Sequence, residues 1–342
     1  MNNIQTKNKQ RNVGLDLIKI LACLGVVALH TLYPSKGCVN RIVTLLAVTS
    51  IPLFFTVNGY LMLRKEELNY KYMLKKILRI LLVCFSWEFL HAVAYLIYYK
   101  RFRNFVISFF MDFFQQGLFF HFWYMGALIL VYLAMPLLHK LLKKAPDIYV
   151  VVFTALIIIC AGIDLSAMIV KQQFILEVPQ NLRCWTWLLY AMAGGYAAME
   201  GKAVRRFDSL NGYVKLFLTG LMLIFISVWQ FWFGTKVFGS VVIEAFYGSL
   251  AALLATMSVF LLCRNVHFSK KSAGWITYCS GLIMGIYIMH PFILAVLNKY
   301  IPAFTQSGMP MNLLFWIGTV VISAIGSAIV QKIPGLRQLL RL

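Results

Sequence analysis

Apolar runs of about 20 residues recur from one end of this chain to the other, separated by short basic breaks. A helical run of that length spans the hydrocarbon core of a bilayer. Transmembrane β-strands would instead alternate in polarity over about ten residues, and the stretches 148–163 and 216–233 do not alternate. Only 13% of the residues are charged, against about a quarter in soluble domains. The sequence therefore predicts an all-α, polytopic membrane protein.

Reading the apolar runs against the basic breaks predicts a bundle of about ten transmembrane helices. Their expected ranges are 14–33, 42–63, 77–99, 118–139, 148–170, 184–200, 213–233, 240–263, 274–297 and 311–331. The stretch 104–116 is rich in aromatic residues but short, and it contains Asp112. We interpret it as an interfacial or re-entrant segment. An extra helix at that point is the alternative, and it would change the parity of the spans.

The placement of positive charge predicts the orientation of the chain. The net charge is +21, but the charges lie in short clusters between apolar runs, which argues against a nucleic-acid-binding surface. With the N-terminus inside, 22 of the 32 Lys and Arg residues fall in inner breaks and nine in outer breaks, as the positive-inside rule requires. We expect one transmembrane domain at 14–331 in the cytoplasmic (inner) membrane, with cytoplasmic tails at 1–13 and 332–342.

Seven cysteines are scattered along the chain without CxxC spacing, so neither a zinc site nor a redox motif is indicated and no metal is predicted. Cys38 and Cys184 both fall in segments that are expected to face outward. A disulfide between them is one interpretation, and two free thiols is the preferred one.

The first predicted helix carries three ionisable groups on one face. Asp16 lies three residues before Lys19, close enough to neutralise its ammonium group, and His30 follows eleven residues later. Eleven residues at 100° each return almost to the same face, about 16 Å further along the helix axis. Ionisable groups at membrane depth are costly and indicate function. Imidazole takes up a proton near neutral pH, so His30 is the candidate base, with Lys19 and Asp16 as candidate catalytic partners.

Further polar groups lie in the second and third predicted spans. Asn58 precedes Gly59, a combination that lets two backbones approach closely or frees a carbonyl group for a ligand. Glu88 and His91 are three residues apart on one helical face, where they are expected to pair.

Charged residues near the span ends can serve a site or only the membrane interface. Lys76 and Arg79 share a helical face at the inner surface, which suits binding of a phosphate, although such clusters also fix topology without binding anything. Asp164 and Glu244 lie near predicted helix ends and are expected to reach the interface. Adding the polar groups of the later spans, the candidate substrate pocket comprises Asn58, Glu88, His91, His121, Trp123, Tyr287 and His290.

These motifs, in this order, resemble those of the acyltransferase 3 family of membrane acyltransferases. That family opens its first helix with Leu-Asp-x-x-Arg and a His after ten further residues. It continues with Phe-Phe-x-x-Ser-Gly-Tyr, Arg-x-x-Arg, His-x-Trp and a late Tyr-x-x-His. The matching residues span about 14 to 295 and are Leu15, Asp16, Lys19, His30, Phe54, Phe55, Asn58, Gly59, Tyr60, Lys76, Arg79, His121, Trp123, Tyr287 and His290.

Three positions depart from the family pattern. Lys19 and Lys76 stand where the family has Arg, and Asn58 stands where it has Ser. Each change keeps charge or polarity, but Lys lacks the bidentate fork that Arg offers to a phosphate or carboxylate. These departures therefore bear mainly on how the donor is bound.

The resemblance implies transfer of an acyl group, typically acetyl, from cytoplasmic acyl-CoA to an outer hydroxyl, typically of a surface polysaccharide or other cell-envelope glycan. Acyl-CoA is then a donor substrate, and no cofactor is bound permanently. Lys76 and Arg79 would hold the CoA phosphates. His30 would either deprotonate the acceptor or carry the acyl group, and both routes stay open, as does the need for a separate extracytoplasmic partner.

Two other functions compete with acyl transfer. A transporter or flippase of a glycan or small solute could use Asp16, Lys19 and His30 as a proton relay. Inverted repeats with broken helices would favour that function, and none is evident in the sequence. A structural or sensing module is the third alternative. Consumption of acetyl-CoA by the purified protein would separate an enzyme from both.

Overall fold

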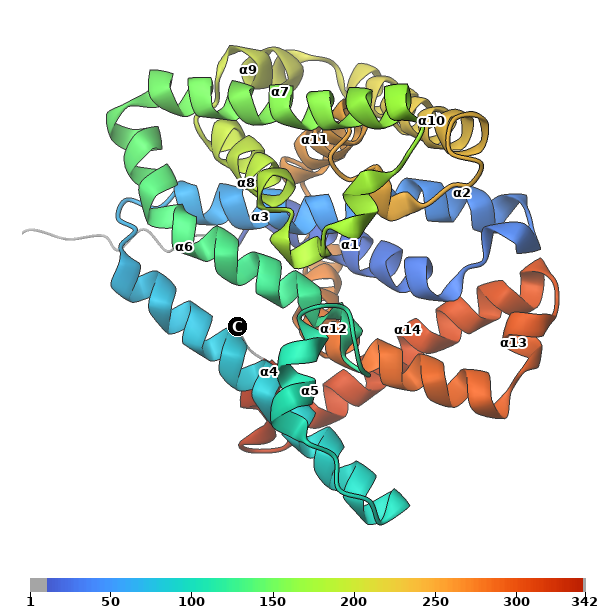
Figure 1. The fold of residues 1–342 in the computed structure, drawn as a ribbon. Coiled ribbons are helices and arrows are strands. Elements are labelled where there is room, and N and C mark those ends of the chain that lie inside the picture. Colours follow the sequence, from blue (N-terminus) through green and yellow to red (C-terminus); the bar gives the residue numbers. More distant parts are fainter. Residues whose placement is uncertain (1–10, 341–342) are drawn as a thin grey trace, which may run out of the picture.

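The computed structural model describes residues 11–340, and Figure 1 shows them as a bundle of helices. No β-strand occurs among these residues, so the predicted all-α class is confirmed. The 3₁₀ turns that matter for the site are η3 (Phe120–Phe122), η5 (Gln180–Leu182), η6 (Ile243–Ala245) and η7 (Leu336–Leu340). The helices are α1 Val13–Thr31, α2 Cys38–Leu46, α3 Ser50–Leu63, α4 Tyr70–Tyr99, α5 Phe105–Asp112, α6 Trp123–Lys144, α7 Pro146–Val170, α8 Cys184–Ala198, α9 Lys202–Ser209, α10 Gly212–Lys236, α11 Leu250–Arg264, α12 Lys270–Tyr300, α13 Ala303–Gln306 and α14 Met309–Lys332.

Polar residues in the breaks determine where several helices begin. The side chains of Asn12, Asn69 and Asn104 each accept a hydrogen bond from a backbone N–H in the first turn of α1, α4 and α5. Ser249 and Ser269 do the same for α11 and α12. First-turn N–H groups have no partner within their own helix, so these caps stabilise the point at which each helix starts.

Among residues 11–340, eight helical segments are long and apolar enough to cross a membrane. Each of them overlaps one of the predicted spans. The remaining two predicted spans correspond to α8 and α11, which have 15 residues each. A 15-residue helix rises about 22 Å, less than the hydrocarbon core of about 30 Å. The structure therefore confirms a multi-pass helical membrane protein, and it does not confirm the count of ten crossings.

The segment 104–116 contains only the eight-residue helix α5. Eight residues rise about 12 Å, so α5 cannot cross the bilayer. It packs against α4 and against η3. The interpretation of 104–116 as a non-spanning segment is confirmed, and the alternative of an extra span is wrong.

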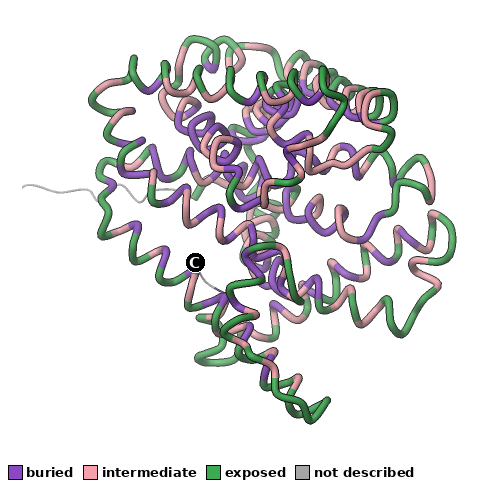
Figure 2. Tube along the Cα trace, in the orientation of Figure 1, coloured by how far each residue is buried: buried purple, intermediate pink, exposed green. Residues whose placement is uncertain are grey.

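The buried centre of the bundle contains the crossing of α3 and α8, within the purple region of Figure 2. A Cβ atom added at Gly59 would lie 1.9 Å from the carbonyl oxygen of Ala191, and one added at Gly194 would lie 2.1 Å from that of Thr56. Small residues at such crossings let helix backbones come into contact. The close approach expected at Asn58 and Gly59 is therefore confirmed.

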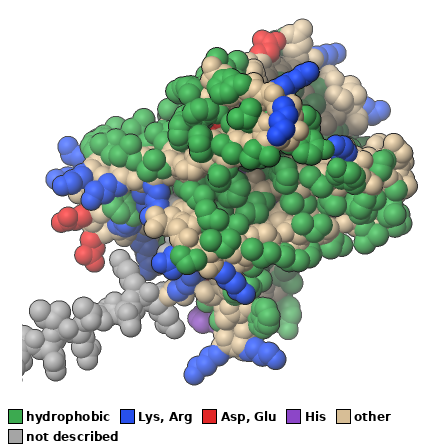
Figure 3. Space-filling model, turned by 90° about the horizontal axis from the view of Figure 1, so that it is seen from below, with side chains coloured by type: hydrophobic (Ala, Val, Ile, Leu, Met, Phe, Trp, Pro, Cys, Tyr) green, Lys and Arg blue, Asp and Glu red, His purple; other side chains and the backbone are tan. Residues whose placement is uncertain are grey.

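The outward surfaces of α7, α10 and α14 are apolar. Large exposed side chains on these helices include Val151, Ile158, Ile169, Leu216, Phe217, Ile224, Ile325 and Ile329. Soluble monomers rarely expose apolar patches of this extent. Figure 3 shows one face of the molecule covered largely by hydrophobic side chains. This surface is the one that contacts lipid.

The residues that follow α14 fold back onto the bundle. η7 packs against α4 and α14, the indole Nε1 of Trp87 donates a hydrogen bond to the carbonyl oxygen of Leu339 (3.1 Å), and Leu340 is buried. The predicted tail at 332–342 thus includes a docked segment. Residues 341–342, and residues 1–10 of the predicted N-terminal tail, lie outside the described part of the chain.

The predicted orientation can be tested with native and introduced cysteines. All seven cysteines are free, so the preferred interpretation of Cys38 and Cys184 as two thiols is confirmed. Cys38 is exposed in the break that should face outward, and we expect a membrane-impermeant maleimide to label it on intact cells. Glu66→Cys in a Cys38→Ser, Cys184→Ser background should react only after permeabilisation, because the α3–α4 break is expected to be cytoplasmic. Labelling of Glu66→Cys on intact cells would contradict the orientation.

Candidate active site

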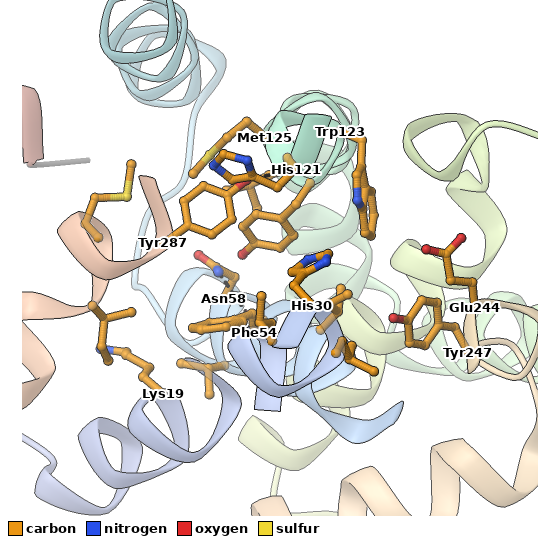
Figure 4. Close-up of a pocket in the computed structure, with 18 of the residues that line it drawn as sticks. Lys19, His30, Phe54, Asn58, His121, Trp123, Met125, Glu244, Tyr247 and Tyr287 are labelled. Atoms are coloured by element: carbon orange, nitrogen blue, oxygen red, sulfur yellow. Dashed lines mark hydrogen bonds between the residues drawn. The ribbon is translucent and has the colours of Figure 1, made fainter. Parts of the chain in front are cut away.

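A cavity of about 760 Å³ lies inside the bundle (Figure 4). Its walls come from α1, α3, α4, α6, α12, η3 and the loop between α10 and α11. Aromatic side chains form much of the wall, and polar groups converge on it at a few points, as is typical of substrate sites. The polar and charged residues on the wall include Arg11, Lys19, His30, Asn58, Lys76, His121, Glu244 and Ser280.

Three imidazole rings meet at one side of the cavity. His30 comes from the last turn of α1, His121 from η3 and His290 from α12. The ring centroids of His30 and His290 are 5.4 Å apart, and those of His121 and His290 are 5.2 Å apart. His30 and His121 line the cavity, whereas His290 is fully buried behind them. Residues separated by up to 260 positions thus form one cluster.

The hydrogen bonds of His290 define which of its nitrogens carries a proton. Its Nδ1 lies 3.1 Å from the carbonyl oxygen of Ile286. A carbonyl oxygen only accepts hydrogen bonds, so Nδ1 is the donor and Nε2 keeps a lone pair in the neutral ring. Tyr287 donates a hydrogen bond from its hydroxyl to the carbonyl oxygen of His121 (2.6 Å). This bond ties η3 to α12 and holds His121 at the cavity wall.

Asn58 is held in the wall by two hydrogen bonds. Its Nδ2 donates to the carbonyl oxygen of Phe54 (2.9 Å), and its Oδ1 accepts from the hydroxyl of Tyr132 (3.0 Å). Trp123 and Tyr124 line the same cavity. The structure therefore brings Asn58, His121, Trp123 and Tyr287 to the cavity, as the sequence predicted.

The Asp16 carboxylate organises the basic end of the cavity. Lys19 Nζ lies 3.2 Å from Asp16 Oδ1, which is the pairing expected from their spacing. Arg11 also pairs with Asp16, and the Ser280 hydroxyl donates to Oδ1 (2.9 Å). Asp16 is buried and does not line the cavity itself. It holds Lys19, which lines the cavity.

The two residues of α4 that were predicted to bind phosphate have different positions. Lys76 lines the cavity together with Arg11 and Lys19, whereas Arg79 is not part of the wall. Leu340 of η7 also lines the cavity. The structure thus places one of the two predicted phosphate-binding residues on the cavity surface.

Glu88 and His91 do not line the cavity, so their assignment to the substrate pocket is corrected. They pair with each other, with Nδ1 of His91 3.4 Å from Oε2 of Glu88, and Nε of Arg103 lies 3.7 Å from Oε1 of Glu88. Asp112 of α5 is fully buried nearby, and burial together with the Glu88 carboxylate raises its pKa. This cluster fastens the segment 104–116 to α4, because it joins residues of α4, α5 and the loop between them.

Sequence reasoning missed several wall residues, two tyrosines among them, and misplaced Glu244. Tyr124 and Tyr247 line the cavity, yet no motif distinguished them from the chain's many other tyrosines. Glu244 was expected at the membrane interface, but it lies on the cavity wall in η6. The predicted span 240–263 obscured this, because its helix begins only at Leu250. The charge of Glu244 within an apolar run was the one available signal.

Comparison with known proteins identifies the family. A family model described as an acyltransferase domain, that of acyltransferase 3, matches residues 12–332. The chain belongs to the acyltransferase 3 family. This acyltransferase 3 protein is also similar to an amino-acid racemase of Enterococcus faecalis, with 25% identity over 329 residues. The match covers 87% of the chain but 44% of the racemase, so the chain spans less than half of that relative's length. No solved structure matches it.

Family membership has a direct consequence for the cavity. The match extends over nearly the whole chain, and it includes every α-helix that contributes to the cavity wall, with only Arg11 and Leu340 of the wall outside it. The protein is thus a multi-pass membrane protein of the acyltransferase 3 family, and the histidine-lined cavity is its candidate active site.

Proposed function

We propose that this acyltransferase moves an acyl group, acetyl in the simplest case, from cytoplasmic acyl-CoA to a hydroxyl of an extracytoplasmic glycan or other cell-envelope component. The observation that carries the proposal is the polarity of one cavity. Arg11 and Lys19 meet at Asp16 and form the basic end of the cavity, and Lys76 also lines the cavity. His30 lies about 16 Å further along α1 than Lys19. Phosphates of CoA suit the basic end, and the thioester would extend toward His30.

The geometry supports general-base catalysis by His30. The imidazole would take the proton of the acceptor hydroxyl while the hydroxyl oxygen attacks the thioester carbonyl carbon. Collapse of the tetrahedral adduct breaks the C–S bond, and the CoA thiolate recovers the proton from the imidazolium. His290 packs its ring against His30 and fixes the plane of the base. Acyl label retained on the quenched protein would indicate an acyl-His relay instead of direct transfer.

A reconstituted assay tests the proposal. Purified protein in proteoliposomes is supplied with radiolabelled acetyl-CoA on the cytoplasmic side and cell-envelope glycan on the other. We expect release of free CoA and label on the glycan, with base-labile ester chemistry. Absence of any acetyl-CoA consumption would contradict the proposal and favour transport of a glycan or solute through the same cavity.

Removal of positive charge from the cavity wall should weaken donor binding. We expect Lys76→Ala to lower acyl-CoA affinity by about 10- to 100-fold, because a lost charged hydrogen bond costs on the order of 1.5–3 kcal/mol. Adding Arg79→Ala should weaken it further. Isothermal titration with CoA measures the affinity, and Lys75→Ala is the matched control because Lys75 is exposed on the same helix and off the cavity wall. Equal affinity for Lys76→Ala and Lys75→Ala would show that this cluster only sets topology.

A further inference from the structure

Glu244 gives the cavity a negative group at the side away from the cations. It is the single acidic residue among the described residues that line the cavity. Figure 4 shows Lys19 and Glu244 on opposite sides of His30, with Tyr247 next to Glu244. A molecule that presents a hydroxyl to His30 from that side therefore lies against Glu244 and Tyr247.

Buried partners hold the Glu244 carboxylate in place. Gln180 donates from its Nε2 to Oε2 of Glu244 (2.9 Å). Gln180 is itself fully buried, and its backbone carbonyl oxygen accepts a hydrogen bond from the indole of Trp187 (2.6 Å). Arg183 is 2% exposed and donates from Nη1 to the backbone oxygen of Glu244 (2.9 Å). Such a network fixes both the main chain and the side chain before any ligand binds.

The second carboxylate oxygen of Glu244 is available to a ligand. Within the described chain, Oε1 of Glu244 has no hydrogen-bond partner, and the side chain is only half-buried at the cavity wall. An ionised carboxylate accepts hydrogen bonds and donates none. A ligand group that faces it must therefore carry a donor, and an anionic group in that position is repelled.

We propose that Glu244 is the specificity-determining residue of the acceptor site. It binds a second hydrogen-bond donor of the acceptor, a neighbouring hydroxyl or an ammonium group, while His30 takes the proton of the reacting hydroxyl. Acceptors that are anionic beside the reacting hydroxyl are rejected. This assignment rests on the proposed function, because it requires that an acceptor hydroxyl reaches His30.

Three matched sugars test the assignment. We measure acetyl transfer from acetyl-CoA to three acceptors. Methyl glucoside is neutral, methyl glucosaminide is cationic and methyl glucuronide is anionic. We expect kcat/KM for the glucuronide to lie about 10- to 100-fold below that for the glucoside, and Glu244→Gln to remove most of this difference. If the wild type prefers the glucosaminide over the glucoside and Glu244→Gln loses this preference, the bound donor is an ammonium group. If the wild type uses the glucosaminide and the glucoside equally well, the bound donor is a hydroxyl. If no glycoside is acylated, the same ratios are measured as inhibition of glycan acylation.

Control variants separate specificity from stability. Glu177→Gln removes the same charge from an exposed residue of the loop between α7 and α8 that does not line the cavity, and it should leave the sugar ratios unchanged. Glu244→Gln should retain wild-type CoA affinity. If Glu244→Gln still acylates glycan and keeps the wild-type sugar ratios, the assignment is overturned. Failure of the wild-type protein to consume acetyl-CoA would instead remove the proposed function itself.

Discussion

Replacing His30 with alanine is expected to abolish acyl transfer, with a loss of about 10²–10⁴-fold in kcat, the contribution of a general base. His30 lies on the cavity wall between the basic end and Glu244, where the thioester and the acceptor hydroxyl would meet. The alanine variant should still insert into the membrane and bind CoA with wild-type affinity. Label transfer from acetyl-CoA to glycan measures the effect, and His267→Ala, at an exposed histidine outside the cavity, is the control.

His30→Gln distinguishes a base from a positioning group. Glutamine keeps hydrogen bonding but takes up no proton at neutral pH, so this variant should be nearly as inactive as alanine. Activity in His30→Gln would mean that His30 only positions the acceptor. The base would then be His121, which lines the cavity, or His290, which contacts both other rings. Wild-type transfer in single alanine variants of all three histidines would favour the transporter function.

Gly59→Ala should destabilise the fold more than any other single methyl addition in α3. The added Cβ would lie 1.9 Å from the carbonyl oxygen of Ala191, and a backbone atom cannot turn away as a side chain can. Overpacking of this kind costs about 1–3 kcal/mol or more. We expect a lower midpoint of thermal unfolding in detergent and a lower yield of folded protein.

Gly220→Ala is the matched control for this variant. A Cβ added at Gly220 of α10 meets no atom within 4 Å, so its unfolding midpoint should equal that of the wild type or exceed it. If Gly59→Ala and Gly220→Ala unfold at the same temperature, α3 and α8 are further apart than in this structure.

The arrangement on the first helix was predictable because it is local. Asp16, Lys19 and His30 belong to one helix, so the pitch of that helix alone determines that they share a face. The structure adds that Asp16 holds Lys19 from outside the cavity. Glu88 and His91 were equally predictable as a pair, but helical pitch does not tell whether a face points to a cavity or to a neighbouring segment.

Glu244 shows the limit of that reasoning. The apolar neighbours of Glu244 predicted the start of a span. In the structure, however, α11 begins at Leu250, and the residues before Leu250 form a loop that lines the cavity. Whether an apolar stretch is helical or folds as a buried loop depends on partners such as Gln180 and Arg183, which lie about 60 residues away in the chain. No local pattern contains that information.

The order of residues along the chain was enough to predict a helical membrane protein, the position of most of its spans, and which side chains share a face of one helix. Each transmembrane helix must satisfy its backbone hydrogen bonds internally. A run of consecutive apolar residues is therefore enough to predict it. The meeting of His30, His121 and His290, and the position of Glu244 on the wall of the same cavity, became evident only in the folded structure. These contacts depend on how helices cross, as at Gly59 and Gly194, and lipid supplies no hydrophobic preference for one helix partner over another.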